Sequence, residues 1–121
     1  LAELSRLAGE ASLRATSEAA MDFFSRVFWF TLEFGVAYEA GELRCYGAGL
    51  LSSFGEIEMF RKAQIRPFDI LEMGTTAYDI TRYQPVLFAG ESMEHVIDAL
   101  SAWLHVYDDT WFAHHVAAHA A

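Results

Sequence analysis

The stretch from residue 17 to residue 38 constrains the fold of this chain more than any other. It holds a dense run of large apolar side chains: Met21, Phe23, Phe24, Val27, Phe28, Trp29, Phe30, Leu32, Phe34 and Val36. Wound into one helix, this run would be apolar on nearly every face, and a helix of that kind is buried among other elements. Aromatic residues are poor helix formers, so tertiary packing must hold the helix together. We therefore predict a buried helix from Ser17 to Tyr38, capped by Thr16 or Ser17.

The remaining elements are predicted from apolar spacing, capping side chains and chain breakers. Further helices are expected at 2–14, at 53–62, at 68–73 with Gly74 closing it, from Ser92 onward, and from Asp108 onward. Extended segments are expected at 43–46, after a turn at Gly41, and at 78–90, where Pro85 implies an edge or a bulge. No repeat or linker divides the chain. The predicted class is mainly α with a small amount of β, in one folding unit.

Composition excludes several classes of function. The formal net charge is −9, and there is no cluster of Lys and Arg, so nucleic-acid binding is not expected. No apolar run reaches the roughly 18 residues that span a bilayer, so no membrane partner is expected. The first residues do not resemble a secretory signal, and the single cysteine, Cys45, fits a reducing compartment. We expect a cytoplasmic protein.

Glu33 is an ionisable residue inside the apolar run, with Trp29 and Phe30 one turn before it and Phe34 beside it. Burial of an ionised carboxylate costs several kcal/mol unless the group is paired, neutralised or bound to a metal. Arg26 lies about two turns away, too far for a tight ion pair. From the residues alone, Glu33 is more often a carboxylate that reaches solvent or a distant basic group than a metal ligand or a protonated acid.

Other candidate sites carry weaker signals. The segment 46–53 combines small residues with two hydroxyls at a helix start, which allows a close ligand approach, although a plain turn capped by Ser53 is the more common explanation. His115 and His119 have the spacing of a helical metal pair, although a solvated tail is the more common explanation. His95 and His105 are expected at the surface, and Cys45 in the core. A stripe of rings could line a pocket for an aromatic ligand, although such a stripe is more often plain core: Trp29, Phe34, Tyr78 and Phe88.

Three blocks of the sequence resemble the pterin-dependent aromatic amino acid hydroxylases. The first is Phe28-Trp29-Phe30-Thr31-Leu32-Glu33-Phe34-Gly35, and the second runs from Tyr46 through Gly47-Ala48-Gly49-Leu50-Leu51-Ser52-Ser53 to Glu56. The third runs from Tyr78 to Ser92. Gly9 to Leu13 also resembles the helix that precedes the first block. The likeness covers roughly residues 1–100 and implies the fold of the C-terminal part of a hydroxylase catalytic domain, with residues 105–121 as a divergent helical tail.

The resemblance implies an iron site and two binding surfaces. In this family, two His and one Glu hold Fe(II), and the likeness assigns the Glu to Glu33. It places Trp29, Phe34, Gly49 and Ser52 in the amino acid pocket. It places Phe28 and Tyr78 beside a tetrahydropterin such as tetrahydrobiopterin, with Phe28 standing where Tyr is common. The family's two His belong to a His-Glu-x-x-Gly-His pattern that precedes the first block, and every histidine of this chain follows Glu33.

The implied function is ring hydroxylation of a free aromatic amino acid with O₂ as co-substrate. Trp29 resembles the phenylalanine and tyrosine enzymes, and Ile80 resembles the aliphatic residue of the phenylalanine enzymes, so phenylalanine is the expected substrate. The alternative is a non-catalytic domain that keeps the hydroxylase core for packing or association. Self-association as a homo-oligomer is expected under either view, because the apolar faces around residues 23–34 need a cover.

Overall fold

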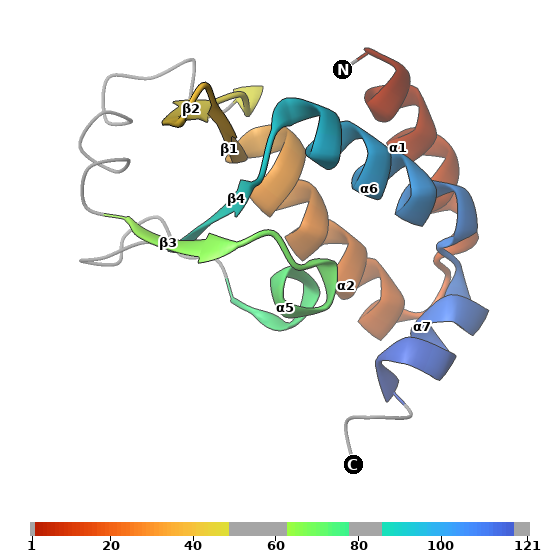
Figure 1. Cartoon of the computed structure of the whole chain (residues 1–121). Helices are drawn as coiled ribbons and strands as arrows, with labels where there is room; N and C mark the ends of the chain where they lie inside the picture. The colour runs from red at the N-terminus through yellow and green to blue at the C-terminus, as the bar shows by residue number, and fades with distance from the viewer. Residues whose placement is uncertain (1, 49–62, 78–85, 118–121) are drawn as a thin grey trace.

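The computed structural model describes residues 2–48, 63–77 and 86–117. In chain order the elements are α1 (Ala2–Arg14), α2 (Glu18–Phe28), the π-helical turn η1 (Trp29–Glu33), β1 (Val36–Glu39), β2 (Glu42–Cys45), β3 (Gln64–Pro67), α5 (Ile70–Thr75), β4 (Val86–Gly90), α6 (Met93–Val106) and α7 (Asp109–His115). The strands lie on one side of the molecule and α1, α6 and α7 on the other, with α2 between them (Figure 1). The mainly helical class with a small sheet is confirmed.

The strands form one mixed sheet in the order β2-β1-β4-β3. β1 and β2 make an antiparallel hairpin, in which Val36 faces Cys45 and Glu39 faces Glu42. Its two-residue turn has positive φ at both central positions, 51° at Ala40 and 81° at Gly41, as in a type I′ turn. β4 pairs in parallel with β1 on one side and with β3 on the other. Because β4 is central, its residues 87–90 are buried.

The helical layer is held by an apolar stripe on each helix and by a cluster of rings. α1 buries Leu4, Leu7, Ala8 and Ala11, and it packs against α6, which buries Val96, Leu100, Trp103 and Leu104. In the middle of α2, the ring of Phe23 lies within 6.2 Å, between centroids, of four other rings: Trp103, Tyr107, Trp111 and Phe112. A smaller cluster of Val36, Leu87 and Ala89 lies against the sheet. The two clusters meet where α2 passes through η1 into β1.

Several predictions of local structure are confirmed. The first helix has the predicted bounds, and the apolar residues on one of its faces are buried. Ser17, Ser92 and Asp108 each cap a helix with a side-chain oxygen that accepts a backbone N–H. The turn at Gly41 and the strand that follows it are present, one residue earlier than predicted.

Two predictions are wrong, and one strand was missed. The helix predicted to reach Tyr38 ends at Glu33, and Val36–Glu39 is a strand, because pairing with both β2 and β4 outweighs local apolar content. The strand β3 was not predicted. The short helix spans Ile70–Thr75 instead of 68–73, and Gly74 lies inside it, buried, rather than closing it. The predicted helix at 53–62, and the part of the predicted extended segment at 78–85, lie outside the described residues.

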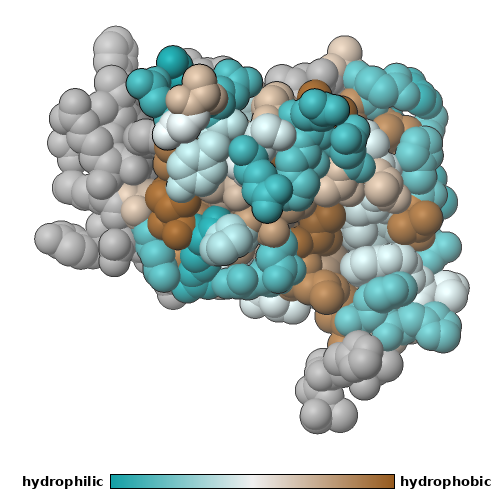
Figure 2. Space-filling model, in the orientation of Figure 1, coloured by the Kyte–Doolittle hydropathy of each residue, from teal (hydrophilic) through white to brown (hydrophobic). Residues whose placement is uncertain are grey.

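Two surface features complete the fold. In the part of the chain that the structure describes, no helix combines the length and apolar character needed to cross a membrane. Figure 2 shows hydrophobic residues reaching the surface near the middle of the visible face, with hydrophilic residues on either side.

Candidate active site

The site is built where α2 widens into the π-helical turn η1. The Phe34 N–H donates to the carbonyl of Trp29, five residues back, at 2.8 Å. Thr31 is fully buried, and its hydroxyl donates to the carbonyl of Val27 at 2.7 Å and lies 3.4 Å from that of Phe28. The Thr31 hydroxyl therefore links η1 to the last turn of α2, where the α-helical hydrogen-bond pattern changes to a π-helical one. π-helical turns of this kind are frequent at functional sites.

The wider turn brings Trp29 and Phe34 together. In an α-helix of about 3.6 residues per turn, side chains five residues apart point roughly 140° away from each other. Here the two rings are in contact, with centroids 4.0 Å apart and planes inclined by 35°. Both were predicted to line the amino acid pocket. Glu33 lies between them in the sequence, and in the structure their rings are in contact.

Glu33 is the last residue of η1 and is half-buried. The carboxylate is only partly covered because the chain leaves the helical layer at this residue. Among the described residues, nothing forms an ion pair or hydrogen bond with this carboxylate. Arg26 is turned elsewhere and donates to the Gly74 carbonyl at 3.4 Å. A half-buried carboxylate with no protein partner in the described part of the chain is available to a metal ion or a ligand.

The backbone behind Glu33 is packed unusually tightly against the end of the β1–β2 hairpin. The N–H groups of Tyr46 and Gly47 both donate to the carbonyl of Gly35, at 3.0 and 3.1 Å. Burial raises the pKa of the Tyr46 phenol well above its ordinary value, and its hydroxyl has no hydrogen-bond partner among the described residues. The lack of a side chain at Gly47 lets its backbone lie directly against the backbone of Glu33 and Gly35.

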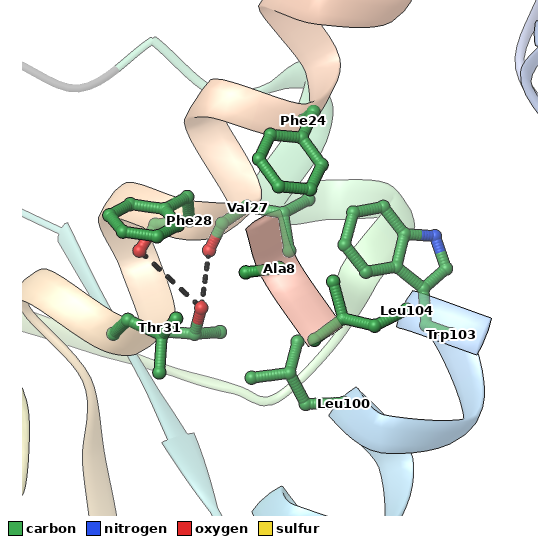
Figure 3. Close-up of a pocket in the computed structure, with 9 residues that line it drawn as sticks. Ala8, Phe24, Val27, Phe28, Thr31, Leu100, Trp103 and Leu104 are labelled. Carbon is green, nitrogen blue, oxygen red and sulfur yellow. Dashed lines mark hydrogen bonds between the residues drawn. The ribbon is translucent and has the colours of Figure 1, made fainter. Parts of the chain in front are cut away.

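Phe28 projects into a shallow apolar groove between α1, α2 and α6. Figure 3 shows its ring there with Phe24, Leu100 and Trp103, beside the hydrogen bonds of Thr31. The space open to a water-sized sphere in this groove is about 10 Å³. That is about what one water needs, so an amino acid does not fit. Phe28, expected beside a pterin, therefore faces the helical side of the turn.

Of the other residues considered, Gly49, Ser52, Tyr78, Ile80 and His119 lie outside the described part of the chain. Phe88 belongs to the core, where it meets Phe30 edge-on at 4.9 Å between centroids, so the aromatic stripe is divided between site and core. Cys45 packs against the small cluster of the sheet, as expected of a core residue.

The histidines of the described residues do not gather into a site. His115 is exposed and stacks on Trp111, with centroids 4.3 Å apart. His105 is exposed, as predicted. His95 is partly exposed at the surface: its Nδ1 accepts the N–H of Glu91 at 3.1 Å, and its ring meets Phe68. Across residues 2–48, 63–77 and 86–117, no three His, Cys, Asp or Glu side chains are grouped closely enough to hold a metal.

Thr31, Gly35 and Tyr46 shape the site but were assigned no role from sequence. Thr31 and Gly35 belong to the sequence block that contains Glu33, and this position could have indicated that they shape the site. Nothing in the sequence shows that the helix takes a π turn at Thr31. Gly35 follows η1 and Tyr46 follows β2, so their contact depends on the pairing of β1 with β2 and could not be predicted from the local sequence.

Comparison with known proteins adds the family. The model of the biopterin-dependent aromatic amino acid hydroxylases matches residues 1–116. The phenylalanine 3-hydroxylase of Streptomyces coeruleorubidus is 48% identical over 108 residues, which are 89% of this chain and 39% of that protein. The phenylalanine-4-hydroxylase of Caenorhabditis elegans is 39% identical over 104 residues, 84% of this chain and 22% of that protein. The chain thus spans well under half the length of these relatives.

Solved structures agree with this assignment. Iron(III)-bound phenylalanine hydroxylase of Chromobacterium violaceum superposes with a TM-score of 0.71 at 26% identity, over 88% of this chain and 42% of that one. The same enzyme with iron(III) and 7,8-dihydrobiopterin gives a TM-score of 0.68 at 28% identity, over 89% of this chain and 39% of that one. Together with the matched blocks around Glu33 and Gly47, these findings show that the chain belongs to the biopterin-dependent aromatic amino acid hydroxylase family.

Proposed function

We propose that this chain forms the Glu33 side of the iron site in a tetrahydropterin-dependent enzyme that hydroxylates the ring of free phenylalanine. The observation that carries the proposal is the half-buried Glu33 carboxylate, unpaired within the described residues, at the end of a π-helical turn beside two aromatic rings. In this proposal residues 1–104 are the C-terminal part of the catalytic domain, and residues 105–121 are a divergent helical tail.

The donor that Glu33 offers fits iron. A single carboxylate combined with two imidazoles, leaving open positions, is the ligand set of non-haem Fe(II) oxygenases. Bound iron, with a tetrahydropterin as reductant, would supply the activation of O₂. The part that falls to this chain is to present one carboxylate oxygen to the metal. Arg26 donates to the Gly74 carbonyl instead of pairing with Glu33, so it does not compete with the metal for this carboxylate.

The amino acid pocket is assigned to Trp29, Phe34, Gly49 and Ser52. Of these, Trp29 and Phe34 would contact the ring of the substrate. The contact between the Trp29 and Phe34 rings fixes both planes, and such pairs add about 0.5–1.5 kcal/mol beyond their buried area. A preset aromatic wall next to the metal ligand would hold a substrate ring within reach of the oxidant and exclude water from it. Phe28 and Tyr78 are assigned to the pterin side from the family resemblance alone, since the ring of Phe28 lies in the groove between α1, α2 and α6.

Phenylalanine is proposed as the substrate on the combination of Trp29 with the aliphatic Ile80. The two relatives named above are phenylalanine hydroxylases that differ in the ring position stated in their names. Either position would be consistent with the proposed site, and product identity separates them. Association into a homo-oligomer is part of the proposal, because the groove along α2 leaves Phe24 and Phe28 only partly covered.

Product analysis tests the proposal. The full-length protein is incubated with Fe(II), tetrahydrobiopterin, O₂ and phenylalanine, and the products are separated by chromatography against 3-hydroxyphenylalanine and tyrosine. We expect one of the two to form, at a rate that depends on both Fe(II) and the pterin. Turnover of tyrosine or tryptophan in preference to phenylalanine would overturn the substrate assignment. No hydroxylation of any of the three would favour a non-catalytic domain.

A further inference from the structure

We infer that Gly47 and Tyr46 are positioning residues for the Glu33 carboxylate: together they form a steric stop that fixes the backbone of Glu33. This inference rests on the proposed role of Glu33 as a metal ligand. It concerns residues that do not themselves touch the metal, and it comes from the contacts behind η1.

Gly47 is buried directly against the peptide group of Glu33. A Cβ atom added to Gly47 would lie 2.5 Å from the Glu33 carbonyl oxygen and 2.6 Å from its carbonyl carbon. It would also lie 2.5 Å from the Gly35 nitrogen. These are all backbone atoms, so no side chain can rotate to make room. Any side chain at position 47 must displace the peptide that carries Glu33.

Tyr46 blocks movement in a second direction. A Cβ atom added to Gly35 would lie 2.1 Å from the Cζ atom and 2.1 Å from the hydroxyl of Tyr46, and 2.3 Å from the Thr31 carbonyl. The Tyr46 ring therefore fills the space next to Gly35, two residues after Glu33. The N–H groups of Tyr46 and Gly47 both donate to the Gly35 carbonyl, which holds the end of the hairpin against this segment.

The segment of chain that precedes Glu33 is also held in place by hydrogen bonds. The bond from Phe34 N–H to the Trp29 carbonyl spans Glu33, and the buried Thr31 hydroxyl anchors the turn to Val27. Glu33 is therefore held between the π turn before it and the Gly47–Tyr46 stop behind it. Its side chain has only two methylene groups between backbone and carboxylate, so a shift of the peptide is passed on to the oxygens.

Metal ligation is sensitive to such shifts. Metal–ligand distances are held to within about 0.2 Å in built sites. Changes in residues that orient a ligand without touching the metal cost roughly 10- to 100-fold in affinity. The inference therefore predicts a loss of metal affinity out of proportion to any loss of stability when Gly47 gains a side chain.

The experiment compares two buried glycines of the same chain. Gly47→Ala is compared with Gly74→Ala, which serves as the control. The Cβ added at Gly74 would lie 2.2 Å from the ring of Phe23 in the core, and not against the backbone of Glu33. Each full-length variant is freed of metal and titrated anaerobically with Fe(II), and its melting temperature is measured in parallel. We expect both to melt lower than wild type, but only Gly47→Ala to lose about 10- to 100-fold in Fe(II) affinity. Equal Fe(II) affinity in the two variants would overturn the inference.

A second variant keeps the test decisive if Gly47→Ala does not fold. Tyr46→Leu removes the ring beside Gly35 without adding a clash, and we expect weaker Fe(II) binding. Substitution with Co(II) should also give altered ligand-field absorption bands, which report the coordination geometry and not turnover. Unchanged Fe(II) affinity and bands in Tyr46→Leu would contradict the steric stop.

The controls separate this inference from the proposed function. Failure of the wild-type protein to bind Fe(II), or wild-type affinity in Glu33→Gln, would remove the iron-ligand role itself. Loss of binding in Glu33→Gln with wild-type affinity in Gly47→Ala and Tyr46→Leu would remove the positioning role alone.

Discussion

Capping side chains decide where the helices of this domain begin. Four of them accept the N–H three residues ahead: Ser17 from Ala20, Asp69 from Glu72, Ser92 from His95 and Asp108 from Trp111. Each satisfies a donor that the first helical turn leaves without a partner. Three of the four were predicted as helix starts from sequence, because capping is a local property that needs no tertiary information.

Asp109 acts beyond its own helix. Its carboxylate accepts the N–H groups of Thr16 and Ser17, at 2.9 and 3.2 Å, and the hydroxyl of Thr16. It therefore joins α7 to the segment that leads into α2. The hydroxyl of Thr16, followed by the two N–H groups, holds the pKa of Asp109 below its ordinary value.

The shift of Asp109 predicts an acid sensitivity. Since the folded protein lowers this pKa, its stabilisation is present above the unfolded value of about 4 and is lost as the pH falls through the folded value. We expect Asp109→Asn to be less stable than wild type near neutral pH and to lose less stability on acidification. Thermal unfolding at a series of pH values checks this, with Asp98→Asn, exposed on α6, as control. Parallel curves for wild type and Asp109→Asn would contradict the assignment.

Tyr107 ties the end of α6 to the start of α2. It is fully buried, and its hydroxyl donates to the carbonyl of Ala20 at 2.5 Å. We expect Tyr107→Phe to lower the free energy of unfolding by about 1 kcal/mol, the usual net value of such a bond. Tyr38→Phe is the control, because Tyr38 is 42% exposed on β1. Denaturant unfolding of both variants measures the difference, and equal stabilities would show that the buried hydroxyl contributes nothing.

At the scale of elements, α1 is held to the domain by one face. Leu7 is 3% exposed in the contact with α6, whereas Leu13 on the same helix is 82% exposed. We expect Leu7→Ala to cost about 2–5 kcal/mol and Leu13→Ala to cost close to nothing. Chemical denaturation of the two variants tests this. A similar loss in both would mean that α1 does not pack as described.

Two strands that are fixed by pairing with distant segments could not be predicted from the sequence. β3 contains Gln64, Ile65, Arg66 and Pro67, which lack the alternating apolar pattern of a strand, and it exists because it pairs with β4. Val36–Glu39 continues an apolar helical run in sequence and becomes a strand because β2 and β4 lie on either side of it. Local pattern favours one structure at these positions, and the sheet selects another.

The same distinction applies to the candidate site. The identity of Glu33, Trp29 and Phe34 followed from their resemblance to a family, and the structure places them together. Their mutual geometry did not follow, because it depends on the π turn at Thr31 and on the approach of the hairpin through Gly47. Gly49, Ser52 and Tyr78 lie outside the described residues, and their roles stay predictions.

At the scale of the whole molecule, Glu33 lies at the junction of the helical core and the smaller cluster of the sheet. Trp29 packs with the first cluster and Phe34 with the second, so the aromatic pair beside Glu33 spans both. A site placed at such a junction is supported from two directions. This arrangement explains how a half-buried carboxylate can be held in place without a charged partner among the described residues.

The iron content of Glu33→Gln in the full-length protein tests the central claim most directly. The variant keeps the size of the side chain and removes its charge, so the fold should survive, as circular dichroism and the melting temperature would show. After anaerobic loading with Fe(II) and removal of excess metal, elemental analysis should find about one iron per chain in wild type. The account predicts almost none in the variant. A folded variant that retains the iron content of wild type would contradict it.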